Sequence, residues 1–564
     1  MTRKRSSVIR KENSKSAMEP TPSCGHVFVL NCDSIGIAAD AILIPIRDLN
    51  DDGDLHEEKM RVKPGTVNAL SPAEIEAAGL IGVSRCFEGQ ISTRLYDTEE
   101  EAVSGTMMVV DAFLQAAGAA LKGQKSGFKR AKPLLALPMP GVGKMDQSGL
   151  IDEMGSVLRP LLSRLYTAAD DFGVDVALCT TDTGAFKVAH VLRETCCPWQ
   201  GGPFWMLPAE LQQEAQSLQA KASSGRLGLL FGAGVSFPSG LPSWGGLLQQ
   251  LAARAGFSEE EQQQLLELGM LDQPTLIEER MGDATRFKEA VAECVKHGRY
   301  TPAHSILGSM ELPAVTTNYD PLYEKAVDSA AASDIERVWR LPWDAAKIAR
   351  MPSRVRRLLK LHGCVVDPRS IVLTRADYMR YEDGRRALRG VLHQNLLERE
   401  YLVVGFSMTD DNVHLIIDQV RKALAGLRDC HGEALGSFSM GTIVPLVESP
   451  MFRKLWEKDF RVVACASSWD DNPAWKHDIF LDKLASGLIV KRAAASFVLD
   501  SQYETLLTDS QRKVKEALAP LHALLHDRGV TESKSWPAIE ALLKEFGAPE
   551  CQQQQPVSAE DRYS

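Results

Sequence analysis

Residues 227–244 read LGLLFGAGVSFPSGLPSW, and this stretch decides the fold of the larger part of the chain. Residues 227–231 are mostly apolar and suit a buried strand, and Gly232 and Gly234 then allow a sharp turn and a close approach to a ligand. Residues 244–256 follow with leucine and alanine at helical spacing. A strand, a glycine turn and a helix N-terminus together present free N–H groups and a positive dipole end, which suit a pyrophosphate.

A glycine loop by itself is weak evidence, because ordinary strand-to-helix connections use the same residues. Three later segments strengthen the interpretation, since each places polar residues directly after an apolar run. They read LPAVTTNYDPLYEKA at 312–326, RLLKLHG at 357–363 and YLVVGFSMTDDN at 401–412. In open α/β sheets, ligands bind outside the carboxyl ends of the strands, so these segments predict parts of one site.

The polar residues in these segments also have ordinary structural roles. Asn318 suits a turn, and His362 suits a hydrogen-bonded position in a core. Asp410 and Asp411 suit the cap of the helix that follows them. Taken singly, each residue is explained as well by structure as by chemistry. Only their order along the chain favours a function.

Length and composition narrow the class of protein. The chain has 564 residues, too many for one core, so two or three domains are expected. Its 44% hydrophobic residues are typical of a soluble protein, and its net charge of -10 argues against a large nucleic-acid surface. No run of 18 apolar residues and no apolar secretory signal occur, so no membrane span is expected. The 11 cysteines are scattered, which favours reduced thiols in the cytoplasm and no metal site.

Strands alternate with helices along most of the chain, which predicts the α/β class with two three-layer, Rossmann-like domains. The expected parts are a basic disordered tail at 1–20, a first α/β domain at 21–205, a helical connector at 206–224, a second α/β domain at 225–490, a helical segment at 491–546 and a disordered tail at 547–564. The charged stretch 259–297 is expected to be a helical insertion in the second domain. In 491–546, the apolar residues suit either an oligomer interface or packing against the second domain. They are Leu521, Leu524, Leu525, Ile539, Leu542 and Leu543.

The order GAGVS, SGLPSW, TTNYD, KLHG and GFS resembles the sirtuin family throughout residues 225–420. Within that family, the chain is similar to the divergent sirtuin-like branch of bacterial anti-phage systems, which hydrolyses NAD instead of deacylating proteins. Ser243, Trp244 and Gly245 stand where deacetylases have Asp-Phe-Arg, and only Cys364 occurs where a four-cysteine zinc ribbon is expected. The resemblance implies a metal-free NAD-binding domain that cleaves NAD to nicotinamide and ADP-ribose.

The resemblance also implies roles for particular residues. Asn318 would position the nicotinamide ribose or the attacking water, His362 would be the general base, and Asp320 would shape the nicotinamide end of the pocket. The residues implied to hold the rest of NAD are Gly232, Ala233, Gly234 and Ser236 at the pyrophosphate, and Gly405 and Ser407 on the adenosine side. Cleavage of the nicotinamide–ribose bond needs a fixed dinucleotide and a base that activates water.

The first domain resembles macrodomains over about residues 25–192. The residues that carry this resemblance are Asp33, which would read the adenine of ADP-ribose, and Gly141, Val142 and Gly143, which would form the phosphate loop. Residues 44–47, IPIR, replace the paired asparagines of macrodomains, which argues against ADP-ribosyl hydrolysis and leaves binding. The alternative is a generic α/β domain in which Asp33 and Gly141 only form turns.

The sequence thus predicts an NAD glycohydrolase that is held inactive until a trigger arrives, because constant NAD depletion would kill its host. One alternative is an ADP-ribosyltransferase that uses the same loop and His362. Another is a module that senses nucleotides or binds partners without catalysis. The expected partners are NAD, ADP-ribose or a related signalling nucleotide, a phage protein or operon partner as trigger, and further copies of the chain.

Overall fold

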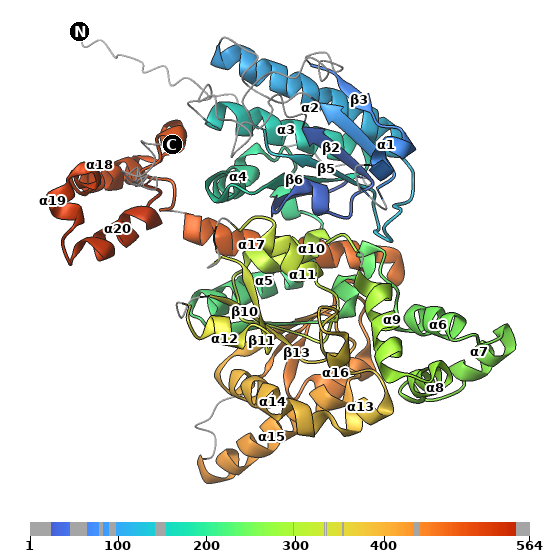
Figure 1. The fold of residues 1–564 in the computed structure, drawn as a ribbon. Coiled ribbons are helices and arrows are strands. Elements are labelled where there is room, and N and C mark those ends of the chain that lie inside the picture. Colours follow the sequence, from blue (N-terminus) through green and yellow to red (C-terminus); the bar gives the residue numbers. More distant parts are fainter. Residues whose placement is uncertain are drawn as a thin grey trace, which may run out of the picture.

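The computed structural model describes residues 24–45, 65–77, 80, 83–89, 98–140, 154–296, 298–331, 333, 336–351, 355–431, 439–493 and 495–548. The predicted N-terminal tail and most of the predicted C-terminal tail lie outside these residues. So do Gly141, Val142 and Gly143, the predicted phosphate loop of the first domain. The described residues form a mixed α/β structure built on two sheets (Figure 1).

The first sheet has six strands in the order β1-β6-β5-β2-β4-β3, and only the β3–β4 pair is antiparallel. Its strands are β1 Val27–Asn31, β2 Ala41–Pro45, β3 Val67–Ala69, β4 Arg85–Gly89, β5 Leu134–Pro138 and β6 Asp175–Thr180. Its helices are α1 Pro72–Ala77, α2 Glu99–Leu121, α3 Met154–Phe172 and α4 Thr183–Cys196. Helices α2 and α3 both carry buried apolar residues at helical spacing, such as Val109 and Phe113 on α2 and Leu158 and Leu162 on α3.

The second sheet has seven strands, all parallel, in the order β13-β12-β11-β7-β8-β10-β9. Its strands are β7 Leu227–Phe231, β8 Ala314–Thr316, β9 Val338–Leu341, β10 Arg356–Lys360, β11 Glu400–Val404, β12 Gly441–Ile443 and β13 Phe460–Val462. Because β7 is first in the chain but lies between β8 and β11, the strand order reverses beside it. A ligand crevice forms at the carboxyl ends of strands where the order reverses in this way.

Strand β7 shows why its sequence is almost wholly apolar. All five of its residues are buried. Leu229 packs into the larger hydrophobic cluster on one face of the sheet, and Leu230 packs into the smaller cluster on the other. Gly228 leaves room for the ring of Tyr401 on β11, because a Cβ there would lie 2.8 Å from that ring. A strand covered on both faces needs a continuous apolar run instead of an alternating one.

Helices accompany the second sheet in two groups. The first group is α5 Ala209–Ser223, α10 Pro302–Ser309, α11 Leu322–Asp328, α12 Ala345–Ile348, α14 Tyr381–Glu398, α15 Asp411–His431 and α16 Pro450–Trp456. The second group is the stretch expected to be a helical insertion, which contains α7 Glu259–Leu266, α8 Asp272–Met281 and α9 Ala284–Lys296. Helices α6 Trp244–Arg254 and α13 Arg375–Met379 contact the second group. Figure 1 shows α7 and α8 projecting from one side of the molecule.

One helix, α17 Pro473–Ala493, joins the two sheets. It packs against α4 of the first unit and against α5 and α10 of the second. Its sequence lacks a polar stripe because nearly every side is buried, as expected for a helix that is covered all round. The sequence assigned this helix wholly to the second domain, whereas it contributes to a hydrophobic cluster that is continuous through both units.

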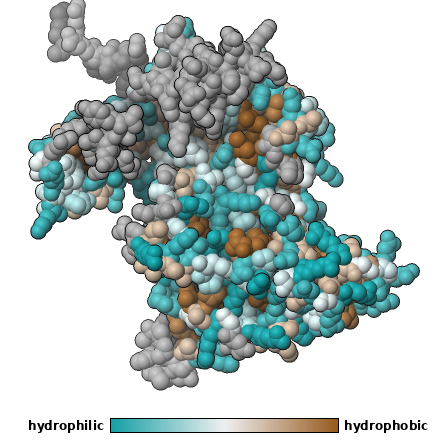
Figure 2. All heavy atoms as spheres, viewed as in Figure 1, coloured by the Kyte–Doolittle hydropathy of each residue, from teal (hydrophilic) through white to brown (hydrophobic). Residues whose placement is uncertain are grey.

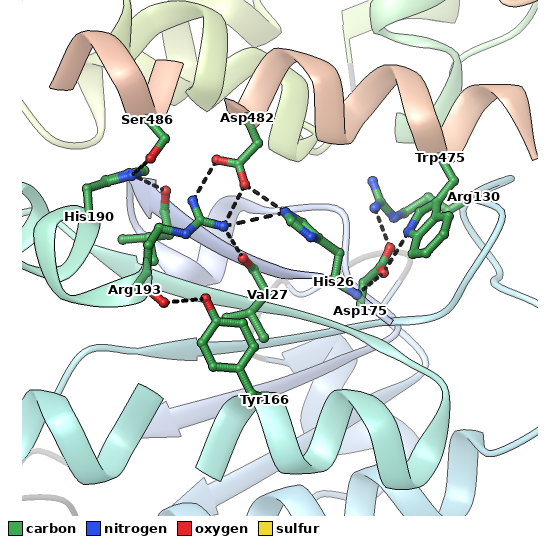
Figure 3. A network of polar contacts seen from close by, with 11 residues as sticks. His26, Val27, Arg130, Tyr166, Asp175, His190, Arg193, Trp475, Asp482 and Ser486 are labelled. Carbon is green, nitrogen blue, oxygen red and sulfur yellow. Dashed lines mark hydrogen bonds and ion pairs between the residues drawn. The ribbon is translucent and has the colours of Figure 1, made fainter. Parts of the chain in front are cut away.

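Buried polar contacts hold α17 in place (Figure 3). Arg193 of α4 donates to both carboxylate oxygens of Asp482 at 3.0 and 2.8 Å and to the carbonyl oxygen of Val27 at 2.7 Å. His26 Nε2 lies 2.7 Å from Asp482. A buried charge is tolerated only when it is paired and hydrogen-bonded, and Asp482 meets both conditions. These contacts make the two units one structural body around α17.

The C-terminal helices are α18 Asp509–Ala523, α19 Arg528–Thr531 and α20 Trp536–Glu545, and they stand apart from both sheets in Figure 1. Leu525, Leu543 and Trp536 are buried in a small cluster of their own. Of the two alternatives offered by the sequence, packing against the second domain is not seen for these residues, because the helices pack mainly on one another. The oligomer interface stays a prediction. Leu542 remains 39% exposed.

Helix α2 is the one helix, among the described residues, that is long and apolar enough to cross a membrane by length and composition. The core helices of many proteins pass the same test, and just over half of its apolar window is buried here. Val109 and Phe113 on this helix are fully covered. On the face shown in Figure 2, hydrophobic residues form separate patches among hydrophilic ones and no continuous band. The helix is therefore weak evidence for a membrane span.

Candidate functional site

A cleft of about 720 Å³ opens where the loops after β7, β8, β10 and β11 converge. This volume lies within the usual range of small-molecule and cofactor sites. The residues predicted from the sequence that line it are Ala233, Gly234, Ser236, Asn318, Asp320, His362, Gly405 and Ser407. Gly232 lies just behind them, and its carbonyl oxygen accepts a hydrogen bond of 3.2 Å from Asn318 Nδ2. Four segments far apart in the sequence are thus brought to one edge of the sheet.

The glycines of this site let two loops touch backbone to backbone. The Gly234 amide donates to the Gly405 carbonyl at 2.8 Å. A Cβ on Gly234 would lie 2.8 Å from Gly405 Cα, so a side chain there would separate the loops. Gly405 has a φ of +58°, and a Cβ on it would lie 2.6 Å from the Val235 amide nitrogen. Both positions therefore require glycine for packing, apart from any ligand.

Four backbone amides of the glycine loop are hydrogen-bonded, whereas the sequence predicted that they are free. Those of Gly232, Gly234, Val235 and Ser236 donate to carbonyl oxygens of the protein. The chain also passes through two short 3₁₀ turns before α6 begins, with Ser243 as its N-cap. The prediction that these N–H groups are free for a pyrophosphate is wrong for these four amides. Binding through them requires the loop to change its hydrogen bonds.

Ser236 lies at the centre of a buried hydrogen-bond network below the cleft. Its hydroxyl donates to Asp320 at 3.0 Å and accepts from Asn318 Nδ2 at 3.1 Å. His304 Nε2 lies 3.2 Å from the same oxygen. Because the Thr301 amide donates to His304 Nδ1 at 3.0 Å, the neutral imidazole carries its proton on Nε2 and donates to Ser236. The atoms of Asn318, Asp320 and His304 that face the Ser236 hydroxyl are therefore all hydrogen-bonded to it.

Sequence reasoning missed His304. Burial lowers the pKa of this histidine to about 3, so it stays neutral and acts as a fixed donor. It is fully buried and holds the serine that in turn holds Asn318 and Asp320. A usable signal was present in the sequence: Thr301 and Pro302 open helix α10, and His304 occupies the capping-box position three residues after Thr301.

Asn318 has an unused hydrogen-bond acceptor that a ligand could occupy. Its side chain is 7% exposed, and its amide nitrogen is used by Gly232 and Ser236. Among the described residues, its Oδ1 atom has no hydrogen-bond partner. A buried acceptor without a donor is costly unless a ligand or water supplies one. The amide group is therefore oriented by the protein at its nitrogen and available at its oxygen.

His362 follows β10 and faces Asp410. Its Nε2 atom lies 3.4 Å from Asp410 Oδ2. Gly363 follows with a φ of +102°, and a Cβ there would lie 2.3 Å from the Ser370 carbonyl oxygen, so only glycine fits. Asp410 Oδ2 accepts from the Tyr378 hydroxyl at 2.7 Å. The predicted capping role of Asp410 is also confirmed, because its Oδ1 accepts from the Val413 amide at 3.0 Å.

Asp410 is held as a carboxylate. Burial alone raises its pKa, but the charge of His362 and hydrogen bonds from Tyr378 and the Val413 amide outweigh burial and lower the pKa to about 2. A fixed negative charge therefore stands beside the imidazole at the edge of the cleft.

Asp33 is not part of this cleft. Its carboxylate accepts from the Ile35 amide at 3.0 Å, which is the turn-forming role that the sequence offered as an alternative. Its backbone contacts the second unit, since its amide donates to Ser329 Oγ at 3.1 Å and its carbonyl accepts from the Tyr300 hydroxyl. Within the part of the chain that the structure describes, no three His, Cys, Asp or Glu side chains gather in a way that holds a metal ion.

Comparison with known proteins identifies part of this region. Residues 313–458 match the SIR2-like domain. They include Asn318, His362 and the loop after β11, but not the glycine loop after β7. The match therefore covers three of the four segments that build the cleft.

Three curated relatives carry the name NAD(+) hydrolase ThsA. The protein of Bacillus cereus (strain MSX-D12) is 29% identical over 197 residues, which are 34% of this chain and 39% of the relative. That of Enterococcus faecium is 28% identical over 215 residues, or 36% and 41% of the two chains. That of Acinetobacter baumannii (strain 532279) is 27% identical over 191 residues, or 34% and 38%. The chain thus spans about two fifths of the length of these relatives.

Proposed function

We propose that this protein hydrolyses NAD to nicotinamide and ADP-ribose in the cleft between the loops after β7, β8, β10 and β11. The observation that carries the proposal is the convergence of Asn318 and His362 on one cleft at the point where the strand order reverses. The match to the SIR2-like domain and the name of the relatives support the same reaction.

The side chains of the cleft suit the steps of this reaction. Loss of nicotinamide leaves an oxocarbenium-like ribose, and water adds to its C1′ carbon while a base takes the proton. His362 lines the cleft, and an imidazole nitrogen is a suitable acceptor for the proton of the attacking water. The unpartnered Oδ1 of Asn318 accepts a hydrogen bond from a ribose hydroxyl or from the water. Gly234 and Gly405 let the dinucleotide approach the backbone.

The test is the release of nicotinamide and ADP-ribose from NAD by the full chain, followed by chromatography. We expect His362→Ala to lower kcat by about 10²- to 10⁴-fold, the usual contribution of a general base. Asn318→Ala is expected to lower turnover as well. Asp418→Asn serves as the control, because this carboxylate pairs with Lys422 on the exposed side of α15. Full activity in both cleft variants would contradict the site, and no turnover by the wild type under any trigger would contradict the reaction.

An ADP-ribosyltransferase would use the same cleft and the same histidine. The relatives are named as hydrolases, which favours water as the acceptor. Mass spectrometry of the reaction separates the two activities: a hydrolase releases free ADP-ribose, whereas a transferase adds its mass to a protein or nucleic acid.

For the first unit, we propose a macrodomain-like site for ADP-ribose or a related signalling nucleotide. The supporting observation is the contact between its β1–β2 loop and the segment that enters α10. Arg299 Nε donates to the Ile37 carbonyl at 2.9 Å, and the Ala38 amide donates to the Tyr300 carbonyl at 2.8 Å. The same segment continues to His304 below the cleft. A ligand that moves the loop therefore has a short path to the catalytic network.

Calorimetry of the full chain with ADP-ribose and related nucleotides tests this site. The full chain is required because the hydrophobic cluster runs through both units, so an isolated first unit exposes part of its core. Asp33→Ala is the matched variant. Unchanged binding in that variant would exclude Asp33 as the adenine contact, and no binding by either protein would leave the first unit with a structural role.

The biological setting is proposed on the same resemblance. The enzyme would act in the cytoplasm as an anti-phage effector that depletes NAD once a phage protein, an operon partner or a nucleotide signal releases it. A homo-oligomer is expected from the family resemblance. Size-exclusion chromatography with light scattering, before and after addition of nucleotide, measures the assembly.

A further inference from the structure

We propose that Asp410 is a positioning residue that sets the tautomer of His362, so that Nε2 carries the proton and Nδ1 accepts the proton of the attacking water. The inference rests on the proposed NAD hydrolysis and deepens it. Sequence reasoning gave Asp410 only a capping role, and the match to the SIR2-like domain assigns it none.

The two carboxylate oxygens of Asp410 have different tasks. Oδ1 accepts from the Val413 amide and caps helix α15. Oδ2 points toward His362 and Tyr378, at 3.4 Å from the imidazole Nε2 and 2.7 Å from the phenol oxygen. The first oxygen fixes the carboxylate on the start of a long helix, where the helix dipole also favours a negative charge. The second oxygen is thereby aimed at the histidine.

Aromatic side chains and a backbone hydrogen bond restrict the movement of the His362 ring. The ring makes edge contacts with Tyr378 and Tyr381, with centroid distances of 5.6 and 5.9 Å. Its backbone is held on the other side, because the Val372 amide donates to the His362 carbonyl at 2.9 Å. Among the described residues, Nε2 has no partner in full hydrogen-bond geometry, and Asp410 is the carboxylate nearest to it.

The tautomer follows from this arrangement. A carboxylate accepts hydrogen bonds and donates none, so Nε2 beside Asp410 carries the proton in the neutral ring. The lone pair then lies on Nδ1, which is the nitrogen able to take a proton from water. Asp410 remains charged and unprotonated throughout, in the role of an orienting carboxylate. In the reaction, water adds to C1′ of the ribose, nicotinamide leaves with the bonding electron pair, and the water proton moves to Nδ1.

Capping alone does not explain the second oxygen. A cap needs only Oδ1, and asparagine caps helices as well as aspartate does. Asp410→Asn therefore keeps the cap. It places either an amide N–H opposite the Nε2–H, where two donors meet, or a neutral oxygen that holds the tautomer more weakly. The substitution thus separates the capping role from the proposed one.

The first test compares NAD hydrolysis by the wild type, Asp410→Asn and the control Asp418→Asn on the exposed side of the same helix. We expect Asp410→Asn to lower kcat by about 10- to 100-fold, as outer partners of functional histidines do, with KM within about twofold. Circular dichroism at the assay temperature verifies that the variants are folded. An unchanged kcat, or a loss confined to KM, would overturn the proposal.

A double-mutant cycle with His362→Ala gives the second readout. If Asp410 acts through His362, then Asp410→Asn has no further effect once the imidazole is gone. Single-turnover nicotinamide release at high enzyme concentration measures the slow variants. An equal loss in both backgrounds would mean that Asp410 supports the fold or substrate binding and not the histidine. Failure of NAD hydrolysis in the wild type would instead reject the reaction, so the two failures are distinct.

Tyr378→Phe is a milder variant that sharpens the result. It removes one hydrogen bond from Asp410 Oδ2 but keeps the carboxylate and the aromatic contact with His362. We expect a loss of kcat smaller than that of Asp410→Asn. A larger loss would assign the main role to the tyrosine hydroxyl and would overturn the role of Asp410.

Discussion

Two of the histidine–aspartate pairs among the described residues, His26–Asp482 and His362–Asp410, differ in their surroundings. At the joint between the units, His26 and Asp482 are 2.7 Å apart and 0% and 1% exposed. At the cleft, His362 and Asp410 are 3.4 Å apart and 5% and 11% exposed. The first pair is enclosed on all sides by core residues, and the second borders a cavity that accommodates a ligand.

The partners of the two carboxylates explain the difference. Asp482 receives both N–H groups of Arg193 in addition to His26, so a cation balances its charge and both oxygens are occupied (Figure 3). Asp410 accepts hydrogen bonds from the Tyr378 hydroxyl and the Val413 amide, and the basic side chain beside it is His362. A pair that is balanced by a buried guanidinium and closed off from any cavity contributes to folding, whereas a pair at the border of a cleft is available for chemistry.

The largest expected effect concerns the pair at the joint. Asp482→Ala leaves Arg193 as a buried charge without its carboxylate, which costs about 3–5 kcal/mol of unfolding free energy. Urea unfolding monitored by circular dichroism measures the loss. A change below about 1 kcal/mol would show that water reaches this pair, and the contrast between a sealed and an open pair would then be wrong.

Acid should weaken the protein through the pair at the cleft. The pKa of Asp410, about 2, lies below its ordinary value, so its contribution is present at neutral pH and is lost as the pH falls through the folded value. The shift corresponds to about 2 kcal/mol, lost between about pH 4 and pH 2. Urea unfolding of the wild type and Asp410→Asn across this range is the measurement. The two proteins should converge toward pH 2, and a constant difference would contradict the pKa.

The smallest expected effect on the free energy of unfolding is at the edge of the contact between α4 and α17. His190 Nδ1 lies 3.2 Å from Ser486 Oγ on α17, in a neutral contact (Figure 3). Ser486→Ala removes one neutral hydrogen bond and is expected to cost about 1 kcal/mol. The same unfolding experiment measures it. A loss as large as that of Asp482→Ala would mean that the hydrogen-bond network, and not the buried charge, holds the two units together.

Much of the cleft follows from local patterns in the chain. The run 227–231 is apolar enough to be a buried strand, and glycines, Asn318 and His362 follow apolar runs as residues at strand ends do. The order of the strands in the sheet does not follow from local patterns, because it depends on contacts between segments that are far apart in the chain. Short strands such as β12 and β13, of three residues each, carry too little periodicity to be recognised.

The polar partners of the site residues also could not be predicted from the sequence. Nothing near His362 indicates that Asp410, 48 residues later, will face it, or that His304 will hold Ser236. Of the amides expected to be free in the glycine loop, that of Gly234 is bonded to the loop after β11, whereas that of Ser236 is bonded within the glycine loop itself. Each of these outcomes depends on which side chains and carbonyl groups meet after folding.

Helix α17 gives a second example of a structure that depends on long-range contacts. From the sequence, no helix is predicted at these residues, and nothing indicates that Asp482 joins the two units. Residue type and spacing reflect interactions between neighbouring positions, so they predict strands, turns, helix caps and the side-chain chemistry that is available. Charge pairing, tautomers and the join between the units arise from long-range contacts, and these exist only once the chain has packed.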